Sequence, residues 1–481
     1  MRLIYKQKIL SVCILALFAF ITLPREYFTE DLVIHVPIVL MRMDANLFSS
    51  DYVRFFRLPD LNPSIYYPVL EVLLRVFFGH MQLLFAFLRL SYFMSLFFIL
   101  FLLSIQFQIS FFAYTVFILL LTSHIQIGGS AVSILESEFL PRGFGLVLVF
   151  CSYYLFLVNK WKIGLLTFIA ATLIHGITAF FAILISAIVL LYRSQNKLLY
   201  RVALTFFICV CFAIWILVPP VDSVWLSILR MRNSYAFIDA WSIKSWINLG
   251  FILTPGLLNL FVTKTRSELR SMIVPIYAGA FILLLIQFLF TFGKPIYPAI
   301  LLQLGRVWLF PALVSFIVLA QFISNYLRRW NKALIVISIG LLVIFVNNRP
   351  QIKVQAAQLQ PWLKTQIWAR YNTNQNCVFL VPFYSKGFRV ESRRSIIGEF
   401  KDGTLSFYSR DFALDWMKRL ELLHNWEQFN FNEMLELAKL YQFDYFILRK
   451  EKQFTDFPVS YANDAFVVQS ISFQPKCESN L

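Results

Sequence analysis

Long apolar segments restrict the possible folds of this chain more than any other feature of its sequence. A helix that crosses a membrane needs about 17–25 mostly apolar residues, because it must satisfy its own backbone hydrogen bonds within lipid. About eleven runs come close to this length, at residues 8–23, 82–103, 107–125, 144–158, 163–175, 176–192, 202–218, 246–262, 271–292, 307–323 and 333–346. We therefore expect an all-α polytopic membrane bundle of about eleven transmembrane helices.

The composition supports a membrane protein and excludes several other classes. Hydrophobic residues make up 59% of the 481 residues and charged residues 14%, against about 45–50% and about 25% in an ordinary soluble domain. These values exclude a soluble globule, a disordered chain and a fibre. The net charge of +17 would otherwise indicate nucleic acid as a partner. Most of the positive excess lies in short loops between apolar runs, so we expect a lipid bilayer and no nucleic acid.

The distribution of charge divides the chain into two parts. Residues 347–481 carry 17 basic and 14 acidic side chains, whereas residues 1–346 carry 26 and 12. We expect a transmembrane domain over 1–346, with a long first outer loop at 24–81, and a small α/β domain over 347–481. In the second domain, periodicity predicts helices at 351–372, 407–423 and 431–442, and strands at 377–381, 395–400, 443–448 and 465–472.

The apolar run over residues 163–192 is ambiguous. It is too long for one ordinary span and too short for two full ones, and it contains His175-Gly176 near its middle. We expect two short helices that meet at His175. One long tilted helix is the alternative, and it would reverse the orientation of every later segment.

Basic loops indicate how the chain is oriented. With the N-terminus inside, the inner loops carry Lys160, Lys162, Arg193, Lys197, Arg201, Lys264, Arg266, Arg270, Arg328, Arg329 and Lys332, as the positive-inside rule predicts. The same orientation places 11 of the 12 acidic residues of the first part outside. The chain has no acceptable Asn-x-Ser/Thr sequon, which favours a bacterial inner membrane. We expect a multi-pass protein with a cytoplasmic N-terminus and an extracytoplasmic C-terminal domain.

The first outer loop combines acidic residues with two amphipathic stretches. Glu30 and Asp31 follow the first span, and His35 stands four positions after Asp31, where a helix would place both on one face. Glu71 and Arg75 have the same spacing in the second stretch. Both stretches are typical of helices that lie in the membrane interface.

The second and third outer loops place arginines at the entrances of helices. Arg142 and Arg306 each stand where an outer loop enters an apolar run, at the depth of lipid headgroups. Arginine suits a phosphate there, because it can donate two parallel hydrogen bonds. The other polar candidates in these loops are Glu136, Glu138, Lys294 and Tyr297.

This layout resembles the GT-C superfamily of integral-membrane glycosyltransferases, and more specifically an uncharacterised bacterial branch of it. The segments that carry the resemblance are Met43-Asp-Ala-Asn-Leu-Phe-Ser-Ser-Asp51, Leu140-Pro-Arg142, Leu173-Ile-His175-Gly and Gly387-Phe-Arg389-Val-Glu-Ser-Arg-Arg394. The acids after the first span, the long first outer loop and the outer tail also match. The chain has Glu30-Asp31 where protein mannosyltransferases have Asp-Glu, and it lacks the Trp-Trp-Asp signature of oligosaccharyltransferases.

The resemblance implies transfer of a sugar from a polyprenyl-phosphate donor to a glycan, lipid or protein acceptor, with inversion at the anomeric carbon. It gives the role of catalytic base to Asp31, with Glu30 as the second candidate. Binding of the donor phosphate falls to Arg142, Arg306, Lys294 and Tyr297. Orientation of the acceptor or of a divalent cation falls to Glu136, Glu138, His35 and His175.

Simpler interpretations apply to the same residues. An acid in an outer loop is often solvated surface. Arg142 and Arg306 equally suit anchors that extend to lipid headgroups, and His175 suits a hydrogen-bonded core histidine. The run from Arg389 to Arg394 either binds an anionic acceptor or forms a solvated loop, and the charge pattern favours the loop.

Three other functions remain open at this level. One is a polymerase or ligase of lipid-linked glycans, the second is a transporter or flippase, and the third is a relative without catalytic activity. Transporters often show internal repeats and broken helices at the midplane. The sequence shows no convincing repeat and its acids gather on one side, so a transferase is the leading hypothesis.

Overall fold

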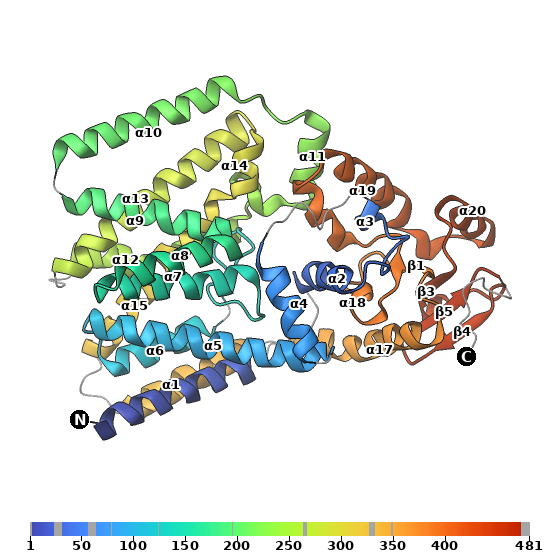
Figure 1. Cartoon of the computed structure of the whole chain (residues 1–481), viewed down its shortest axis with the longest axis horizontal. Coiled ribbons are helices and arrows are strands. Elements are labelled where there is room, and N and C mark those ends of the chain that lie inside the picture. Colours follow the sequence, from blue (N-terminus) through green and yellow to red (C-terminus); the bar gives the residue numbers. More distant parts are fainter. Residues whose placement is uncertain are drawn as a thin grey trace. The chain divides into compact units, whose positions relative to one another are not determined.

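The structure is a computed structural model, and it describes residues 2–23, 31–55, 64–77, 79–123, 125–194, 196–262, 267–326, 332–347 and 350–472. The chain forms two compact units (Figure 1). The helical unit comprises Met1–Arg25, Phe85–Leu226 and Asn233–Asn348. The α/β unit comprises Glu26–Leu84, Ser227–Arg232 and Arg349–Leu481, so it joins most of the predicted first outer loop to the C-terminal segment.

Helices build the helical unit, as the apolar runs predict. Each predicted run falls on a helix: α1 (Arg2–Thr22), α5 (Met81–Gln106), α6 (Phe111–Leu121), α7 (Pro141–Leu157), α8 (Trp161–Ile174), α9 (Gly176–Ser194), α10 (Lys197–Leu217), α12 (Ile243–Val262), α13 (Ser267–Phe288), α15 (Leu309–Tyr326) and α16 (Lys332–Asn347). Shorter elements are η2 (Ser234–Ala236), η3 (Ile238–Ala240), η4 (Leu289–Gly293), α14 (Tyr297–Leu302) and η5 (Leu304–Trp308). The expectation of an apolar helical bundle is confirmed at this level.

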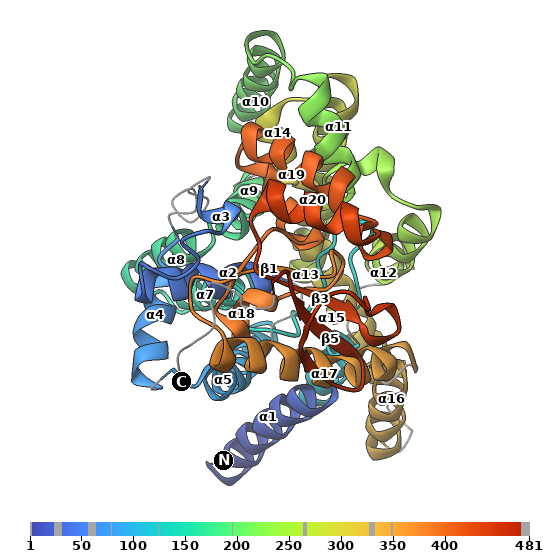
Figure 2. The ribbon, with the colours of Figure 1, turned by 90° about the vertical axis from the view of Figure 1, so that its right-hand side faces the viewer.

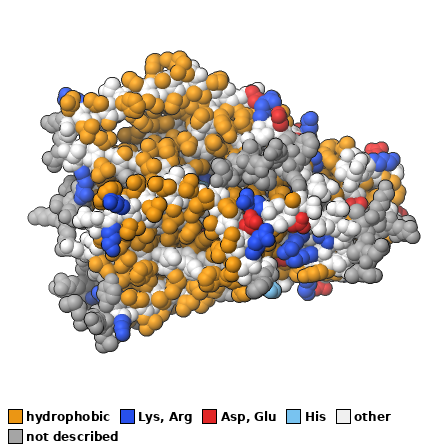
Figure 3. Space-filling view, viewed as in Figure 1, with side chains coloured by type: hydrophobic (Ala, Val, Ile, Leu, Met, Phe, Trp, Pro, Cys, Tyr) orange, Lys and Arg blue, Asp and Glu red, His pale blue; other side chains and the backbone are white. Residues whose placement is uncertain are grey.

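Several of these helices suit a membrane. In the described part of the chain, 4 helices are long and apolar enough to cross one, by length and composition: Met81–Gln106, Gly176–Ser194, Met272–Gly293 and Tyr297–Tyr326. Figure 3 shows hydrophobic side chains over much of the visible face of the helical unit. Leu217 and Phe251 are 76% and 75% exposed, which would be costly in water and is ordinary for a surface that faces lipid.

Local sequence signals set the helix ends. The Ser110 hydroxyl accepts a hydrogen bond from the backbone N–H of Ala113 at the start of α6, and the Asn196 side chain does the same for Leu199 at the start of α10. Pro141 begins α7, where its missing N–H has no intrahelical partner to lose. The 163–192 run is broken at His175, because α8 ends at Ile174 and α9 begins at Gly176. The prediction of two short helices is confirmed.

The α/β unit contains one mixed sheet. Its strands are β1 (Val378–Leu380), β2 (Ser395–Ile396), β3 (Tyr445–Arg449), β4 (Val459–Ala462) and β5 (Phe466–Ser470), in the order β2-β1-β3-β5-β4. Strand β1 is parallel to β2 and to β3, whereas β5 is antiparallel to β3 and β4. The helices are α2 (Leu32–Met43), α3 (Tyr52–Phe55), α4 (Tyr66–Val76), α11 (Ser223–Arg232, whose last residues belong here), α17 (Pro350–Asn372), α18 (Phe388–Ser392), η6 (Phe400–Phe407), α19 (Arg410–Leu423), η7 (Trp426–Gln428), α20 (Phe431–Tyr441) and η8 (Lys450–Lys452).

Alternating side chains of the central strands fill a core on each face of the sheet. Phe446 and Leu448 pack with residues of α19 and α20, whereas Tyr445 and Ile447 pack with residues of α17. Figure 2 shows α17 on one side of β1, β3 and β5, with α19 and α20 on the other. The unit is therefore a three-layer α/β/α arrangement, and the prediction of a small α/β domain is confirmed.

The C-terminal segment differs from the sequence prediction in several elements. The predicted helices and strands are present, although β2 covers only Ser395–Ile396 of the strand predicted at 395–400, and β4, α18, η6, η7 and η8 are additional. Strand β4 lies at the edge of the sheet and is mostly exposed, so it lacks the apolar pattern that identifies a strand. Helix α18 has only five residues, which is too short for helical periodicity to show.

The first outer loop contributes the two helices that its amphipathic stretches predict. Helices α2 and α4 are joined by a hydrogen bond of 2.9 Å between His35 Nδ1 and the Tyr67 hydroxyl, and by an ion pair of 3.2 Å between Arg42 and Glu71. Glu71 also pairs with Arg75 of its own helix at 3.1 Å, as the four-residue spacing predicts. These contacts fix the two helices against each other within the α/β unit.

Candidate functional site

The helical unit contains a cavity that gathers four of the predicted site residues. Glu136, Arg142, His175 and Arg306 all line it, together with Tyr92, Ser133 and Thr178. Its volume is about 40 Å³, and apolar residues such as Leu146 and Phe310 complete the wall. We call it the helical-unit cavity. These polar residues come from α5, the α6–α7 connection, α7, the α8–α9 break, α9 and η5.

Arg142 and Glu136 form a two-point ion pair at the edge of this cavity. The Arg142 guanidinium donates to both carboxylate oxygens of Glu136, at 2.5 and 3.0 Å. Arg142 is the second residue of α7, next to Pro141, so it stands at the positive end of the helix dipole. An arginine at a helix N-terminus favours an anion, and Glu136 holds the guanidinium in a defined orientation.

His175 enters the cavity because the chain leaves helical geometry at that residue. The backbone N–H of Thr178 donates to His175 Nδ1 at 3.2 Å, and the Thr178 hydroxyl lies 2.8 Å from the same nitrogen. Since Nδ1 accepts a hydrogen bond from an N–H, the neutral ring carries its proton on Nε2. His175 therefore carries its N–H at Nε2.

Arg306 is positioned by a buried glutamine on α13. The Gln287 side chain donates to the carbonyl of Ala236 and accepts from the backbone N–H of Leu304, each at 2.7 Å. It thereby fixes the start of η5, which carries Arg306. The Arg306 guanidinium lies 5.4 Å from the centre of the Tyr235 ring. Gln287 gives no signal in the sequence, because a single glutamine within an apolar run resembles any tolerated polar residue.

The other predicted phosphate-site residues do not line the helical-unit cavity. Lys294 donates from Nζ to the backbone carbonyl of Trp215. The Tyr297 ring packs against Trp225, with 5.2 Å between the ring centres. Glu138 is buried but also lies outside the lining.

The predicted catalytic base Asp31 belongs to the α/β unit. Asp31 immediately precedes α2 and forms an ion pair of 3.0 Å with Lys401 Nζ. The two side chains are 25% and 11% exposed, so the pair is only partly open to solvent. Glu30 lies outside the described residues. The His35 side chain forms a hydrogen bond with the Tyr67 hydroxyl through Nδ1.

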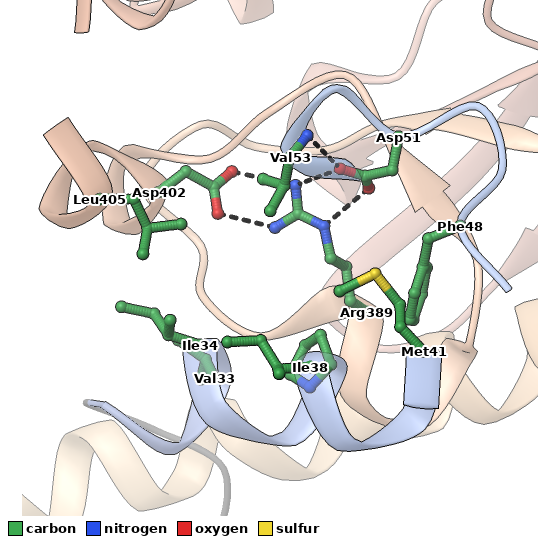
Figure 4. Close-up of a pocket in the computed structure, with 11 residues that line it drawn as sticks. Val33, Ile34, Ile38, Met41, Phe48, Asp51, Val53, Arg389, Asp402 and Leu405 are labelled. Carbon is green, nitrogen blue, oxygen red and sulfur yellow. Dashed lines mark hydrogen bonds and ion pairs between the residues drawn. The ribbon is translucent and has the colours of Figure 1, made fainter. Parts of the chain in front are cut away.

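A buried ionic cluster joins the first outer loop to the C-terminal segment within the α/β unit (Figure 4). Arg389 donates to Asp51 at 2.7 and 3.0 Å and to Asp402 at 2.7 and 3.0 Å. The Tyr52 hydroxyl donates to Asp402 at 3.0 Å, and Glu399 lies beside them. We call these five residues the Arg389 cluster. It borders a small cavity of about 20 Å³ lined by Val33, Ile34, Ile38 and Met41 among others.

The Arg389 cluster overturns the interpretation of residues 389–394 as a solvated loop. Arg389 and Arg394 are both buried. Two carboxylates surround Arg389, and such a pairing is the condition under which a guanidinium leaves water. Asp51 and Asp402 were missed as its partners, because Asp51 stands 338 positions from Arg389.

The charged groups of the Arg389 cluster shift each other's pKa values. Burial alone would lower the pKa of Arg389, but the carboxylates of Asp402 and Asp51 outweigh it and raise that pKa well above its usual value. Burial, reinforced by the charge of Asp402, raises the pKa of Glu399 to about 8. At neutral pH Glu399 is therefore mainly protonated. Its carboxyl accepts a hydrogen bond from the backbone N–H of Gly387 at 3.0 Å.

The sequence allows a divalent cation at the site, but the described part of the chain contains no suitable set of metal ligands. There, no group of three or more His, Cys, Asp or Glu side chains is arranged to hold a metal ion.

Comparison with known protein families gives a match for one segment of the chain. A family model described as Domain of unknown function (DUF6798) matches residues 360–423. The matched segment carries α18, η6 and α19, and with them Arg389, Glu399 and Asp402. No curated protein and no solved structure matches the chain.

Proposed function

We propose that the protein is an integral-membrane glycosyltransferase, similar to the GT-C superfamily, that transfers a sugar from a polyprenyl-phosphate donor to a glycan, lipid or protein acceptor. The observation that supports this proposal is the helical-unit cavity. It brings Arg142 and Arg306 from distant parts of the sequence to the wall of one cavity, with His175 beside them.

The chemistry of the donor explains why these side chains belong together. When the bond between the anomeric carbon and the phosphate oxygen breaks, negative charge grows on the departing phosphate. Arg142 and Arg306 supply positive charge there, and His175 supplies an Nε2–H donor. Glu136 keeps Arg142 in place, so it acts as a positioning residue. The lipid chain needs an apolar environment, which the exposed apolar helices provide.

Asp31 is the proposed base that takes the proton of the acceptor hydroxyl, with Glu30 as its alternative. Attack of that hydroxyl from the face opposite the phosphate inverts the configuration of the sugar. The Asp31 carboxylate forms an ion pair of 3.0 Å with Lys401 Nζ, so a positive charge lies next to the proposed base. In this proposal the protein works in a bacterial inner membrane, with its α/β unit on the extracytoplasmic side.

A transfer assay on the purified full-length protein in lipid nanodiscs tests this proposal. A panel of polyprenyl-phosphate sugars is offered together with a membrane glycolipid extract. We expect the wild type to transfer sugar and Arg142→Gln to lose about 10²–10³-fold of that rate, since it removes one electrostatic contact to the leaving group. The matched control is Arg201→Gln, an exposed arginine on α10, which should keep full activity.

A second pair of variants tests the base. Asp31→Asn should lower turnover by about 10²–10⁴-fold, and the exposed Asp464→Asn should not. Turnover that survives Asp31→Asn would move the base to Glu30. A protein that folds, binds the donors and moves them across the membrane without sugar transfer would replace the transferase by a flippase.

A further inference from the structure

A second arginine-lined cavity lies in the α/β unit. It has a volume of about 410 Å³, within the range of about 300–1,000 Å³ that is common for small-molecule sites. Arg370 and Tyr371 line it from the end of α17, and Arg393 and Arg394 line it from the segment after α18. We call it the Arg370 cavity. None of its lining residues belongs to the helical-unit cavity or to the Arg389 cluster.

Arg394 ties the wall of this cavity together. Its guanidinium donates to the Thr373 hydroxyl at 3.0 Å and to the carbonyls of Arg370, Ser392 and Arg393 at 2.6, 3.3 and 3.2 Å. It also donates to the Thr373 carbonyl. Arg394 therefore satisfies carbonyls at the C-terminal end of α17 and holds the 392–393 segment against it. Its role is to position the other two arginines.

Arg370 and Arg393 bring positive charge to the cavity without a carboxylate partner. Neither guanidinium forms an ion pair with any acid in the part of the chain that the structure describes. The Nε atom of Arg393 is buried and has no hydrogen-bond partner among those residues. Burial, followed by the charge of Arg370, lowers the pKa of Arg393, and the charges of Glu391 and Asp44 offset only part of that shift. Arrangements of this kind are unfavourable unless an anion completes them.

The backbone conformation of Arg393 is also energetically unfavourable. Its φ of 52° lies in the left-handed region, which non-glycine residues adopt rarely. The acid that lines the cavity, Asp44, is already engaged: it accepts from Gln375 at 3.2 Å and from the backbone N–H of Asn46 at 2.9 Å. The lining thus carries three guanidinium groups and one carboxylate.

We infer that the Arg370 cavity binds a phosphoryl group, with Arg370 and Arg393 as its ligands. Arginine side chains grip phosphate oxygens through paired hydrogen bonds, and two of them match a dianion in charge. The ring of Tyr371, 64% exposed, offers a flat face beside them for the group that carries the phosphate. The inference stands independently of the transferase reaction, because no residue of the helical-unit cavity takes part.

Titration of the full-length protein with inorganic pyrophosphate tests the site. The protein is held in nanodiscs of zwitterionic lipid, and binding is followed by ³¹P NMR line broadening and by calorimetry. All variants carry Arg142→Gln and Arg306→Gln, which remove both arginines of the helical-unit cavity. We expect saturable binding in this background, weakened about tenfold or more by Arg370→Gln or Arg393→Gln.

Lys364→Gln is the matched control, because it removes an exposed positive charge from the same helix, α17. It should leave pyrophosphate binding unchanged. Absence of saturable binding, or equal weakening by Lys364→Gln and Arg393→Gln, would overturn the inference. Transfer activity plays no part in this readout, so a failed transfer assay leaves the result intact.

A second arm distinguishes a lipid headgroup from a soluble phosphate as the source of the group. Nanodiscs that contain phosphatidylglycerol replace the zwitterionic ones. If the anionic lipid displaces pyrophosphate and Arg393→Gln removes that competition, a lipid headgroup occupies the site. If pyrophosphate binds equally in both membranes, the site takes a soluble phosphorylated ligand.

Discussion

The Arg389 guanidinium binds Asp51 through two hydrogen bonds, of 2.7 and 3.0 Å, although the two residues stand 338 positions apart. Their side chains are 4% and 1% exposed. Asp51 also accepts a hydrogen bond from the backbone N–H of Ile396 at 3.0 Å, so it supports β2 as well as the arginine. This pair makes the segment around Asp51 a structural part of the α/β unit.

Asp51→Asn should therefore destabilise the α/β unit. Removal of one partner from a buried ion pair costs about 3–5 kcal/mol, because the remaining charge stays buried. The measurement is the free energy of unfolding of the full-length protein in detergent. The exposed Asp464→Asn provides the control. Equal stability of the two variants would show that the pair contributes nothing.

The raised pKa of Glu399, at about 8, predicts a dependence of stability on pH. The folded state favours the protonated carboxyl, whereas the unfolded chain loses its proton near the ordinary value. The stabilisation is fully present below that ordinary pKa and falls as pH rises towards 8. Glu399→Gln mimics the protonated form and should lack this component.

The pH prediction is tested by the difference in unfolding free energy between wild type and Glu399→Gln. From pH 5 to pH 8 the wild type should lose stability relative to the variant, and above pH 8.5 the difference should level off. Comparison of the two proteins cancels the titration of groups that lie outside the Arg389 cluster. A difference that stays constant over this range would contradict the buried protonated carboxyl.

Replacement of Gln287 by an apolar residue should destabilise the helical unit. Gln287→Leu leaves the Ala236 carbonyl and the Leu304 N–H without their partner, at a cost of about 1–3 kcal/mol for each buried group. The same change at exposed Gln106, on α5, should be close to neutral. Thermal unfolding in nanodiscs measures both. If the two variants unfold at the same temperature, Gln287 does not hold η5 in place.

Replacement of two glycines of α12 by alanine should change the stability of the protein in opposite directions. A Cβ at Gly256 would overlap the hydroxyl of Tyr277, which is bonded to the Leu253 carbonyl and to Ser315. Gly256→Ala should cost about 1–3 kcal/mol by overpacking. A Cβ at Gly250 meets no atom within 4 Å, so Gly250→Ala should stabilise the helix by up to about 1 kcal/mol. Thermal unfolding in nanodiscs compares the stabilities of the two variants. A Gly256→Ala protein more stable than Gly250→Ala would contradict the contact between Gly256 and Tyr277.

The shape of Arg142 predicts how a conservative change affects transfer. Arg142→Lys keeps the charge but loses the paired geometry to Glu136, so we expect about a tenfold or larger loss of kcat. Arg201→Lys on α10 should keep the wild-type rate. Single-turnover measurements with a saturating donor separate this loss from weaker binding. An Arg142→Lys enzyme with full kcat would mean that only the charge matters.

The sequence predicts the parts of this structure that depend on local patterns. Apolar runs identify the helices, and the break at His175 follows from the length of the 163–192 run. The strands of the α/β unit with buried apolar residues are also found. The exposed edge strand β4 is missed, because its residues carry no apolar pattern.

Local sequence patterns do not predict the contacts between distant segments. The sequence places Arg142 and Arg306 at helix entrances, but their common cavity depends on how α7 and η5 pack. The pairing of Arg389 with Asp51 and Asp402 has no local signal either. A basic run with few acids nearby therefore resembles a solvated loop, although acids from elsewhere in the chain neutralise Arg389.

The discontinuity of the α/β unit has a consequence for how the chain matures. A ribosome adds about 5–20 residues per second, so roughly 20–70 s separate the synthesis of Asp51 from that of Arg389. During that interval the first outer loop has neither its guanidinium partner nor the sheet that Asp51 supports. The segment around Asp51 therefore completes its fold only after the C-terminal segment has been made.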